Sequence, residues 1–544
     1  MILTLLPFYK ATYEQATLLG VVVCLFTALL SYLPSYLPTR PVKYFPGPKP
    51  WPLLGNFFYY SKVLKNVTVE LPLMAKNFGD ICMLWMGSKP NLLIHNLEDA
   101  HEILTKRSGM TSNRPRTNIF VKRIWPGVLP FAQVGEEMRF YRRIYMDILG
   151  PRQSQEVRKY QDYETKMGLV AFCEKPDEFV SHVTRFAMSV IFSAVYGTRI
   201  SQLDHSVMVE LYDVWNTGLR NIQPGHLIID WLPILEKLPL WLQPWAKLAD
   251  SLHERETAIN RAFLKLLRKR IEAGIVPACF GIDALAYQKK QGFDDSVLVD
   301  LLGGIVVAGS ETTATIMQSF MKLIAMHPEA QKKAQEELDR VVGPSRLPAW
   351  EDQPNLPYIR ALIKELHRYS PILTFAVPHA STEEIVYRGN TIPNDTVIMP
   401  CQESLHHDPK RYDNAEAFQP ERFLGDDLDS LVSARQRDYW KRDHVDYGFG
   451  RRMCPGIQVA ENSLFIQISR YLWAFNITPK PGEPPLDMDD WQELFTRKPR
   501  PFKVNITPRS DAIVQVIQQT AKEAQTDIPD VDDIEMGDLN FTRQ

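Results

Sequence analysis

The sequence predicts a mainly α-helical protein with small β sheets. Apolar residues recur every three or four positions over several long stretches, as in helices that bury one face. Short runs of strand-forming residues, bounded by turn residues, cover residues 80–96 and 384–400, with another near the C-terminus. The chain is 45% hydrophobic with 40 prolines among 544 residues, which favours a folded protein with many turns over a disordered one. The clearest helical patterns cover residues 295–326, 328–342, 356–369 and 457–474.

The chain is predicted to contain a membrane anchor, one large domain and a tail. Residues 16–33 carry no charge and would form a helix of about 27 Å, long enough for one membrane span. Lys and Arg are more frequent just after this run than before it, which places the rest of the chain in the cytosol. A cleaved signal peptide is the alternative interpretation. The expected parts are an N-terminal membrane anchor at residues 1–40, the domain at residues 41–508, and an acidic, partly disordered tail at residues 509–544.

Charge and cysteine content argue against several classes of protein. With 62 Lys and Arg against 64 Asp and Glu, the net charge of −2 gives no support for nucleic-acid binding. The cysteines lie far apart without a CxxC pair, which argues against a zinc site or a disulfide framework and favours a reducing compartment. Most of them are expected to be inert buried thiols. The cysteines are Cys24, Cys82, Cys173, Cys279, Cys401 and Cys454.

One cysteine has a distinctive setting. Cys454 stands within the stretch YGFGRRMCPG, and a helical pattern begins directly after Gly456. The positive end of that helix and the guanidinium of Arg452 are expected to lower the pKa of the Cys454 thiol and to favour the thiolate, which binds soft metals. Gly448, Gly450 and Gly456 allow a flat or bulky ligand to approach closely. The alternative is a buried thiol in a turn before a core helix, and the loop alone does not decide between them.

A long apolar helix is predicted to carry an acid and an alcohol. Residues 301–320 read LLGGIVVAGSETTATIMQSF, with three glycines that each cost about 1 kcal/mol in a helix relative to alanine. Together with Ala308, these glycines are expected to clear one surface for a ligand, and Gly309 to favour a local bulge. Thr312 lies one turn after Ala308 and next to Glu311. The alternative is a close-packed core helix in which the Thr312 hydroxyl bonds back to the helix.

Glu365 and Arg368 lie at positions i and i+3 of another predicted helix. Such a pair is common on solvated helix faces, and that is the alternative interpretation here. Their order in the chain gives them more weight, because they lie between Thr312 and Cys454 and precede a Pro-Glu-Arg-Phe segment at residues 420–423.

Together these motifs resemble the cytochrome P-450 superfamily. The haem-binding loop of that family reads Phe-x-x-Gly-x-Arg-x-Cys-x-Gly; Gly450, Arg452, Cys454 and Gly456 match it, and Tyr447 stands in place of Phe. The resemblance implies a P-450 haem-thiolate fold in which Cys454 is the axial thiolate of the haem iron and Arg452 faces a haem propionate. It also places the extra hydroxyl of Tyr447 near the sulfur, where it would affect the redox potential.

The other motifs match the same family. Its Ala/Gly-Gly-x-Asp/Glu-Thr-Thr pattern corresponds to residues 308–313, which implies that Thr312 hydrogen-bonds bound dioxygen and that Glu311 helps to relay protons. Glu365, Arg368 and Arg422 are implied to form a buried ion triad. The residues implied to contact the haem are Ala308, Gly309, Gly450, Gly456, His379 and Arg142; near Arg142, Met138 stands where the family has Trp. The residues implied to line the substrate cavity are Gly304, Ala308, Thr374, Phe375, Ala376 and Val377. A variable loop at residues 110–135 is implied to cover this cavity.

The resemblance implies a monooxygenase of the microsomal class, similar to filamentous-fungal enzymes of secondary metabolism of the O-methylsterigmatocystin oxidoreductase type. The resemblance implies haem b and O2 as cofactors, with electrons from NADPH through a reductase. The chain has no nucleotide-binding fingerprint, which fits electrons that arrive from another protein. The implied partners are NADPH-cytochrome P-450 reductase, with cytochrome b5 as a second donor, a hydrophobic small molecule and the endoplasmic reticulum membrane. A basic patch for an acidic electron-transfer partner is expected from Arg139, Arg142, Arg143, Lys441 and Arg442; the alternative is that each of them is an ordinary solvated surface charge. The alternatives are a haem-thiolate enzyme of phenol coupling, dehydration or ring rearrangement, and a non-catalytic membrane-anchored haem or lipid binder.

Overall fold

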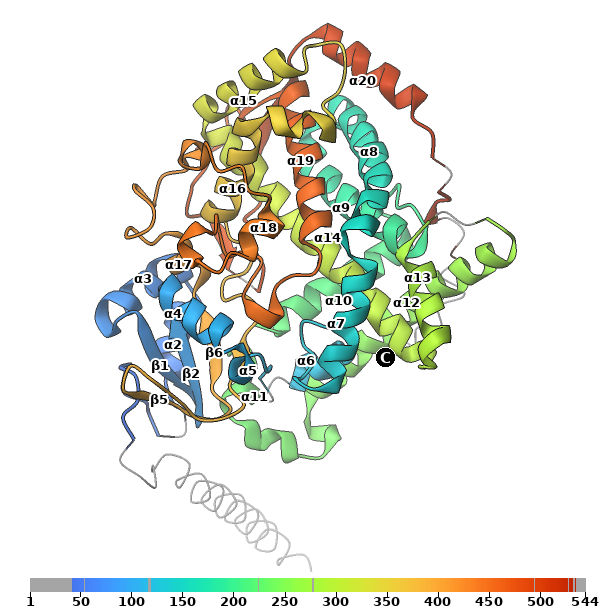
Figure 1. The fold of residues 1–544 in the computed structure, drawn as a ribbon. Helices are drawn as coiled ribbons and strands as arrows, with labels where there is room; N and C mark the ends of the chain where they lie inside the picture. Colours follow the sequence, from blue (N-terminus) through green and yellow to red (C-terminus); the bar gives the residue numbers. More distant parts are fainter. Residues whose placement is uncertain are drawn as a thin grey trace, which may run out of the picture.

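Long helices form the centre of the fold, and small sheets lie at its side (Figure 1). The computed structural model describes residues 42–534 apart from residues 53, 116–118, 224, 276–277, 494, 527 and 532–533. The membrane span expected at residues 16–33 lies outside the described residues. The mainly helical class with small sheets agrees with the expectation from the sequence.

The helices of the first half end with the long α12. They are α2 Phe57–Val63, α3 Val67–Phe78, α4 Leu97–His101, the π-helical turn η2 Glu102–Lys106, α5 Ser108–Thr111, α6 Ile119–Ile124, α7 Glu136–Ile148, α8 Pro151–Glu174, η3 Pro176–Glu178, α9 Phe179–Tyr196, α10 Ser206–Asn221, α11 Ile228–Trp231, η4 Pro233–Lys237, η5 Leu240–Leu242 and α12 Pro244–Glu272.

The second half supplies the helices that carry the sequence motifs. They are α13 Phe280–Gln291, α14 Asp295–Met326, α15 Pro328–Val341, η6 Trp350–Asn355, α16 Pro357–Tyr369, α17 Gln402–His406, η7 Pro420–Phe423, α18 Ser430–Ala434, η8 Tyr439–Lys441, η9 Gly450–Arg452, α19 Ile457–Ala474 and α20 Asp511–Glu523. Several begin with proline at the first helical position, where its missing N–H is not needed.

The largest sheet has four strands in the order β1-β2-β6-β3. Its strands are β1 Ile81–Met86, β2 Lys89–Ile94, β6 Val397–Pro400 and β3 His379–Ala380. β1 and β2 form an antiparallel hairpin in which Ile81 pairs with Ile94, and β6 adds to β2 in parallel. Three two-stranded sheets complete the set, from β4 Ile385–Tyr387 with β5 Asn390–Ile392, β7 Phe475–Pro479 with β10 Val504–Pro508, and β8 Trp491–Glu493 with β9 Arg497–Pro499.

Helix α14 passes through both large apolar clusters of the core. Its N-terminal half packs with α9, α10 and α12, and its C-terminal half packs with α15, α16 and α19. Two of the described helical segments, Pro176–Tyr196 and Asp295–Met326, are long and apolar enough to span a membrane, yet most of each is buried inside the protein. They are therefore core helices, and their hydrophobicity is explained by packing.

The C-terminal tail is more ordered than the sequence predicts. Helix α20 is capped by Ser510, whose hydroxyl accepts the N–H of Ile513, and Ile513 and Ile517 are buried against the core. Farther on, Arg199 forms an ion pair with Asp530, and Val531 is fully buried. An acidic composition suggested partial disorder, but a few apolar residues at helical spacing suffice to dock this tail; residues 535–544 lie outside the described part.

Candidate active site

The loop before α19 needs its glycines. Gly448 and Gly450 have φ values of 83° and 51°, in the left-handed region that glycine adopts without strain. A Cβ on Gly450 would also lie 2.5 Å from the carbonyl oxygen of Leu104. The turn is closed by a hydrogen bond of 3.0 Å from the N–H of Cys454 to the carbonyl of Tyr447. The loop is thus folded tightly enough to fix the position of the cysteine.

Burial dominates the electrostatics of Cys454. It raises the pKa of the thiol, while the N–H of Gly456 and the charge of Arg142 act in the opposite direction. The sequence predicted a lowered pKa with Arg452 as the neighbouring cation. That prediction was wrong for the free thiol, because burial outweighs the helix N-terminus and because Arg142 is the cation that acts on the sulfur. A bound metal cation would supply the charge that stabilises the thiolate.

Three arginines surround this region without an acidic partner. Arg452 donates hydrogen bonds to the carbonyls of residues 112, 129 and 132, Arg114 donates to those of residues 130, 377 and 378, and Arg142 donates to that of residue 453. Within the described part of the chain none of the three forms an ion pair with a carboxylate. His379 is buried beside Arg114 and Arg452; its Nδ1 lies 2.9 Å from the carbonyl oxygen of Thr111, and burial holds its pKa well below the usual value.

The middle of α14 has an open patch between its two buried halves. Ala308 is exposed and Thr312 is half-buried, although the residues on either side of this turn are almost all buried. The Thr312 hydroxyl donates to the carbonyl of Ala308 at 2.7 Å, as in the alternative interpretation of the motif. Glu311 is buried and forms an ion pair with Lys498 of β9. The acid and the alcohol therefore have separate partners in this state.

Helix packing explains the glycines of α14. A Cβ on Gly303 would lie 2.3 Å from Nδ2 of Asn260, one on Gly304 2.7 Å from the hydroxyl of Tyr145, and one on Gly309 2.7 Å from Ile191. The helix is continuous, without the bulge expected at Gly309. The expectation that these glycines clear a surface for a ligand is corrected: each admits a neighbouring side chain, and the open patch is made by Ala308 and Thr312.

A cavity opens between the largest sheet, α6 and the loop before β3. Apolar side chains supply part of its lining, and Arg114, Gln133 and Asp230 supply polar groups. Among the residues expected to line a substrate cavity, Val377 lies here. Thr374, Phe375 and Ala376, which directly precede Val377, are buried and do not belong to the lining of the cavity. Ala376 has a φ of 50°, which is unusual for a residue with a side chain. The apolar part consists of Val121, Phe131, Ile222, Val377 and Phe495, among others.

Glu365, Arg368 and Arg422 meet in a buried ion triad. Arg368 donates to both oxygens of Glu365, at 2.7 Å and 2.8 Å, and Arg422 donates to Glu365 at 3.1 Å. The side chains of Glu365 and Arg368 are fully buried, and Arg368 also donates to three backbone carbonyls of the segment before η7 and of α17. Because every charge is hydrogen-bonded, the triad fixes the meander between α17 and the cysteine loop.

The expected basic patch is present in part. Arg139, Arg142, Arg143 and Arg451 border a surface recess of about 440 Å³ next to the cysteine loop. Arg442 does not belong to it, because this side chain is buried and donates to the carbonyl of Gly448. The Arg442 guanidinium therefore holds the cysteine loop and adds no positive charge to the surface patch.

Two residues of the site were not singled out from the sequence. Arg114 precedes Pro115 inside the segment expected to cover the substrate, and an arginine in such a segment is the signal that would have indicated it, although Arg116 and Arg123 share that signal. Lys498 offers no such signal, because its partner Glu311 lies far away in the chain.

The residues present fit haem b. Guanidinium groups without carboxylate partners suit two propionates. Cys454 and Arg142 line the same cavity of about 180 Å³, and the open Ala308–Thr312 patch gives a helix face for a flat ligand. Arg114, Arg142 and Arg452 would hold the carboxylates and Cys454 the iron.

Comparisons with known proteins agree with this geometry. The family model described as Cytochrome P450 matches residues 45–506. The cytochrome P450 monooxygenase polD of Polytolypa hystricis is 44% identical over 500 residues, which cover 92% of this chain and 96% of that protein. The cytochrome P450 monooxygenases fogE of Aspergillus ruber and virE of Hypocrea virens are 34% and 33% identical, and each alignment covers 88% of this chain and 89% and 88% of the respective relative.

Proposed function

Because the chain belongs to the cytochrome P450 family, it is a haem-thiolate monooxygenase that uses O2 and NADPH-derived electrons, and we propose that it oxidises an apolar or aromatic small molecule of fungal secondary metabolism. The observation that carries the proposal is the cavity beside β3, where Val121, Phe131 and Val377 offer an apolar surface. The fungal origin of the similar monooxygenases supports the metabolic setting.

Haem b supplies, when bound, the centre at which dioxygen is reduced and an oxygen atom is transferred. We propose that Cys454 ligates its iron and that the N–H of Gly456 donates to the sulfur and keeps it oriented. Arg114, Arg142 and Arg452 hold the propionates, each already fixed by backbone carbonyls. Rigid donors of this kind lose little entropy on binding.

Thr312 and Glu311 are proposed to deliver protons. The Thr312 hydroxyl holds its proton toward the carbonyl of Ala308 and must rotate away from it to donate into the open patch. The Oε1 atom of Glu311 is held by Nζ of Lys498, so this ion pair must open before the carboxylate can pass a proton toward Thr312. The rotation of the Thr312 hydroxyl and the opening of the Glu311–Lys498 pair together connect the open patch to Glu311.

Electrons are proposed to arrive at the recess bordered by Arg139, Arg142, Arg143 and Arg451. Its positive charge suits an acidic surface of NADPH-cytochrome P450 reductase, and it lies against the cysteine loop, so the path to the sulfur is short. Cytochrome b5, which is also acidic, is proposed to use the same face.

We further propose that the enzyme is attached to the endoplasmic reticulum membrane and faces the cytosol. Besides the apolar run at residues 16–33, large apolar side chains are exposed on adjacent elements: Trp51 and Phe58 near α2, and Trp241 in η5. A ring contact between Phe57 of α2 and Trp231 of α11 places α2 next to α11, and η4 and η5 follow α11 directly in the chain. Aromatic residues of this kind favour the membrane–water interface.

Turnover tests the function most directly. Microsomes that contain the full chain and a reductase should convert accumulated metabolites of a gene-deletion strain into products one oxygen atom heavier, and only with NADPH. Mass spectrometry that finds the metabolites unchanged, although the haem is bound and reduced, would contradict the proposed substrate class.

A further inference from the structure

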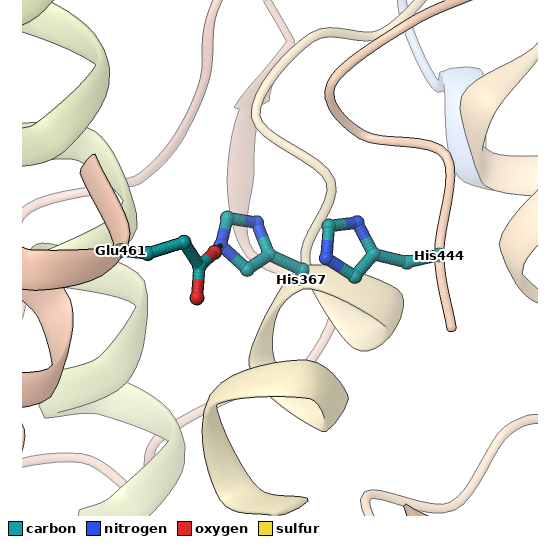
Figure 2. A group of neighbouring side chains, drawn as sticks. All are labelled: His367, His444 and Glu461. Carbon is teal, nitrogen blue, oxygen red and sulfur yellow. Dashed lines mark ion pairs between the residues drawn. The ribbon is translucent and has the colours of Figure 1, made fainter. Parts of the chain in front are cut away.

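A buried group of charged and aromatic side chains lies behind the cysteine loop. Figure 2 shows Glu461 of α19 reaching toward the ring of His367 of α16, while the ring of His444 lies parallel to that of His367. Asp446 and Tyr447, at the start of the cysteine loop, complete the group. The side chains of His367, His444 and Asp446 are about 1% exposed.

Both ring nitrogens of His367 act as donors. Nδ1 lies 2.8 Å from Oδ2 of Asp446, which only accepts when ionised. The Tyr447 hydroxyl donates its single proton to Glu461 at 2.7 Å, so the contact of 3.3 Å between that hydroxyl and Nε2 of His367 needs the proton of the ring. Nε2 also lies 3.4 Å from Glu461. A ring that donates from both nitrogens is an imidazolium.

The same side chains place metal-ligating atoms within 4.8 Å of one another, at His367, His444 and Glu461. The ring geometry argues against a shared ion. The two imidazoles are stacked at 4.4 Å with an angle of 9°, and their nitrogen lone pairs lie in the ring planes, so they do not converge on one point. Nδ1 of His444 already accepts the N–H of Asp446, and a charged His367 would repel a cation.

The group is connected to the cysteine through the backbone of the loop. The carbonyl of Tyr447 accepts the N–H of Cys454, and Asp446 directly precedes Tyr447 in the chain. Asp446 also accepts the N–H of Ile372, so the loop is held to the end of α16. The Tyr447 hydroxyl, which replaces a hydrogen of the usual Phe, is directed to Glu461 and His367 and not to the sulfur.

We propose that His367 is a permanent imidazolium that balances the carboxylates of Asp446 and Glu461 and thereby sets the reduction potential at Cys454. His367 is a positioning residue, since it acts through Tyr447 and Asp446. Without the imidazolium, the carboxylates of Asp446 and Glu461 would be uncompensated next to the cysteine loop. Negative charge near the thiolate stabilises the oxidised iron and so lowers the reduction potential. The pKa of His367 is raised to about 10 because its hydrogen bonds to Asp446 and Glu461 outweigh burial, which agrees with this role. The inference rests on Cys454 as the ligand.

The midpoint potential of the haem iron, measured by spectroelectrochemistry on the full-length enzyme, tests this role. We expect His367→Leu to shift it in the negative direction, Asp446→Asn to shift it in the positive direction, and the double variant to return close to the wild-type value. A structural disturbance alone would shift both single variants in the same direction, which would overturn the proposal, as would unchanged potentials. Glu461→Gln, with the same expected sign as Asp446→Asn, serves if the latter does not fold.

The matched control is Asp438→Asn, which removes an exposed acid from the same segment of the chain. Water screens that charge, so no shift is expected. Elemental analysis separates the imidazolium from a metal site: the purified enzyme should contain iron and no zinc. One zinc per chain that is lost in His444→Ala would overturn the imidazolium assignment. A failed ligand assignment is distinguishable, because then even the wild-type reduced carbon monoxide complex would lack its red-shifted Soret band.

Discussion

Lys498 of β9 forms an ion pair with Glu311 of α14, the residue directly before Thr312. Both side chains are largely buried, so the pair is poorly screened by water. The acid proposed to relay protons is therefore anchored by a cation from the C-terminal part of the domain. The strength of this pair should control how readily Glu311 leaves it.

The first prediction concerns this pair. Lys498→Met removes the cation that positions Glu311, and an unpaired buried carboxylate turns toward water instead of Thr312, so product per NADPH consumed should fall while haem content stays unchanged. Lys498→Arg keeps the charge and should retain most of the coupling. Product and NADPH are measured together in a reductase-reconstituted assay; equal coupling in Lys498→Met and wild type would remove Lys498 from the relay.

Thr312→Ala deletes the hydroxyl of the open patch. Positioned proton donors contribute about 10²-fold or more to rate, so product formation should fall by at least about tenfold while NADPH oxidation continues. The control is Thr313→Ala, because Thr313 is buried on the neighbouring face of α14. Hydrogen peroxide release reports the diverted electrons, and its absence in Thr312→Ala would argue against the proposed role.

Arg114→Gln tests the cofactor cradle. The charged side chain is buried and bonded to three carbonyls, and glutamine keeps some of these bonds but loses the positive charge. We expect faster haem transfer to apomyoglobin, with a small loss of folded stability. Arg139→Gln, at the rim of the surface recess, is the control and should leave haem transfer unchanged. If Arg114 does not hold the haem, Arg114→Gln and Arg139→Gln should transfer haem to apomyoglobin at equal rates.

Glu256 gives a prediction for pH. Its carboxylate accepts the indole N–H groups of Trp125 and Trp215, at 2.7 Å and 2.9 Å, and burial raises its pKa from 4.5 to about 7. Between these values the folded state keeps a proton that the unfolded state has lost, so stability falls as pH rises. The loss approaches about 3 kcal/mol between pH 4.5 and 7.

Glu256→Gln should remove this slope. Urea unfolding midpoints at several pH values measure it, with Glu254→Gln as the control because Glu254 is exposed on the same helix. A wild-type slope in Glu256→Gln would show that Glu256 does not cause this pH dependence. The same variant also tests whether Glu256 joins Trp125 to Trp215. Trp125 stacks on Phe131, which lines the cavity.

Local patterns explain what the sequence could predict. The bounds of α14 and α19 follow from helical periodicity and agree with residues 295–326 and 457–474. The turn before Cys454 follows from its glycines. The resemblance to the cytochrome P-450 family implied that Glu365, Arg368 and Arg422 meet, as the structure has them.

Contacts between distant segments explain what the sequence could not predict. The pair of Lys498 with Glu311 and the docking of Val531 depend on the tertiary fold, and neither leaves a local signal. The pKa of Cys454 was expected to fall because a helix and a cation were visible in the sequence, whereas the depth of burial was not. Arg442 was placed on the surface for the same reason, although it supports Gly448 from within.

The central claim is that Cys454 is the thiolate ligand of the haem iron. The carbon monoxide complex of the reduced enzyme measures this directly, because only a thiolate ligand opposite carbon monoxide gives the strongly red-shifted Soret band. We expect this band in the wild type and in Cys173→Ala, a control at a half-buried free thiol, and its loss in Cys454→Ala. A normal red-shifted band in Cys454→Ala would contradict the account.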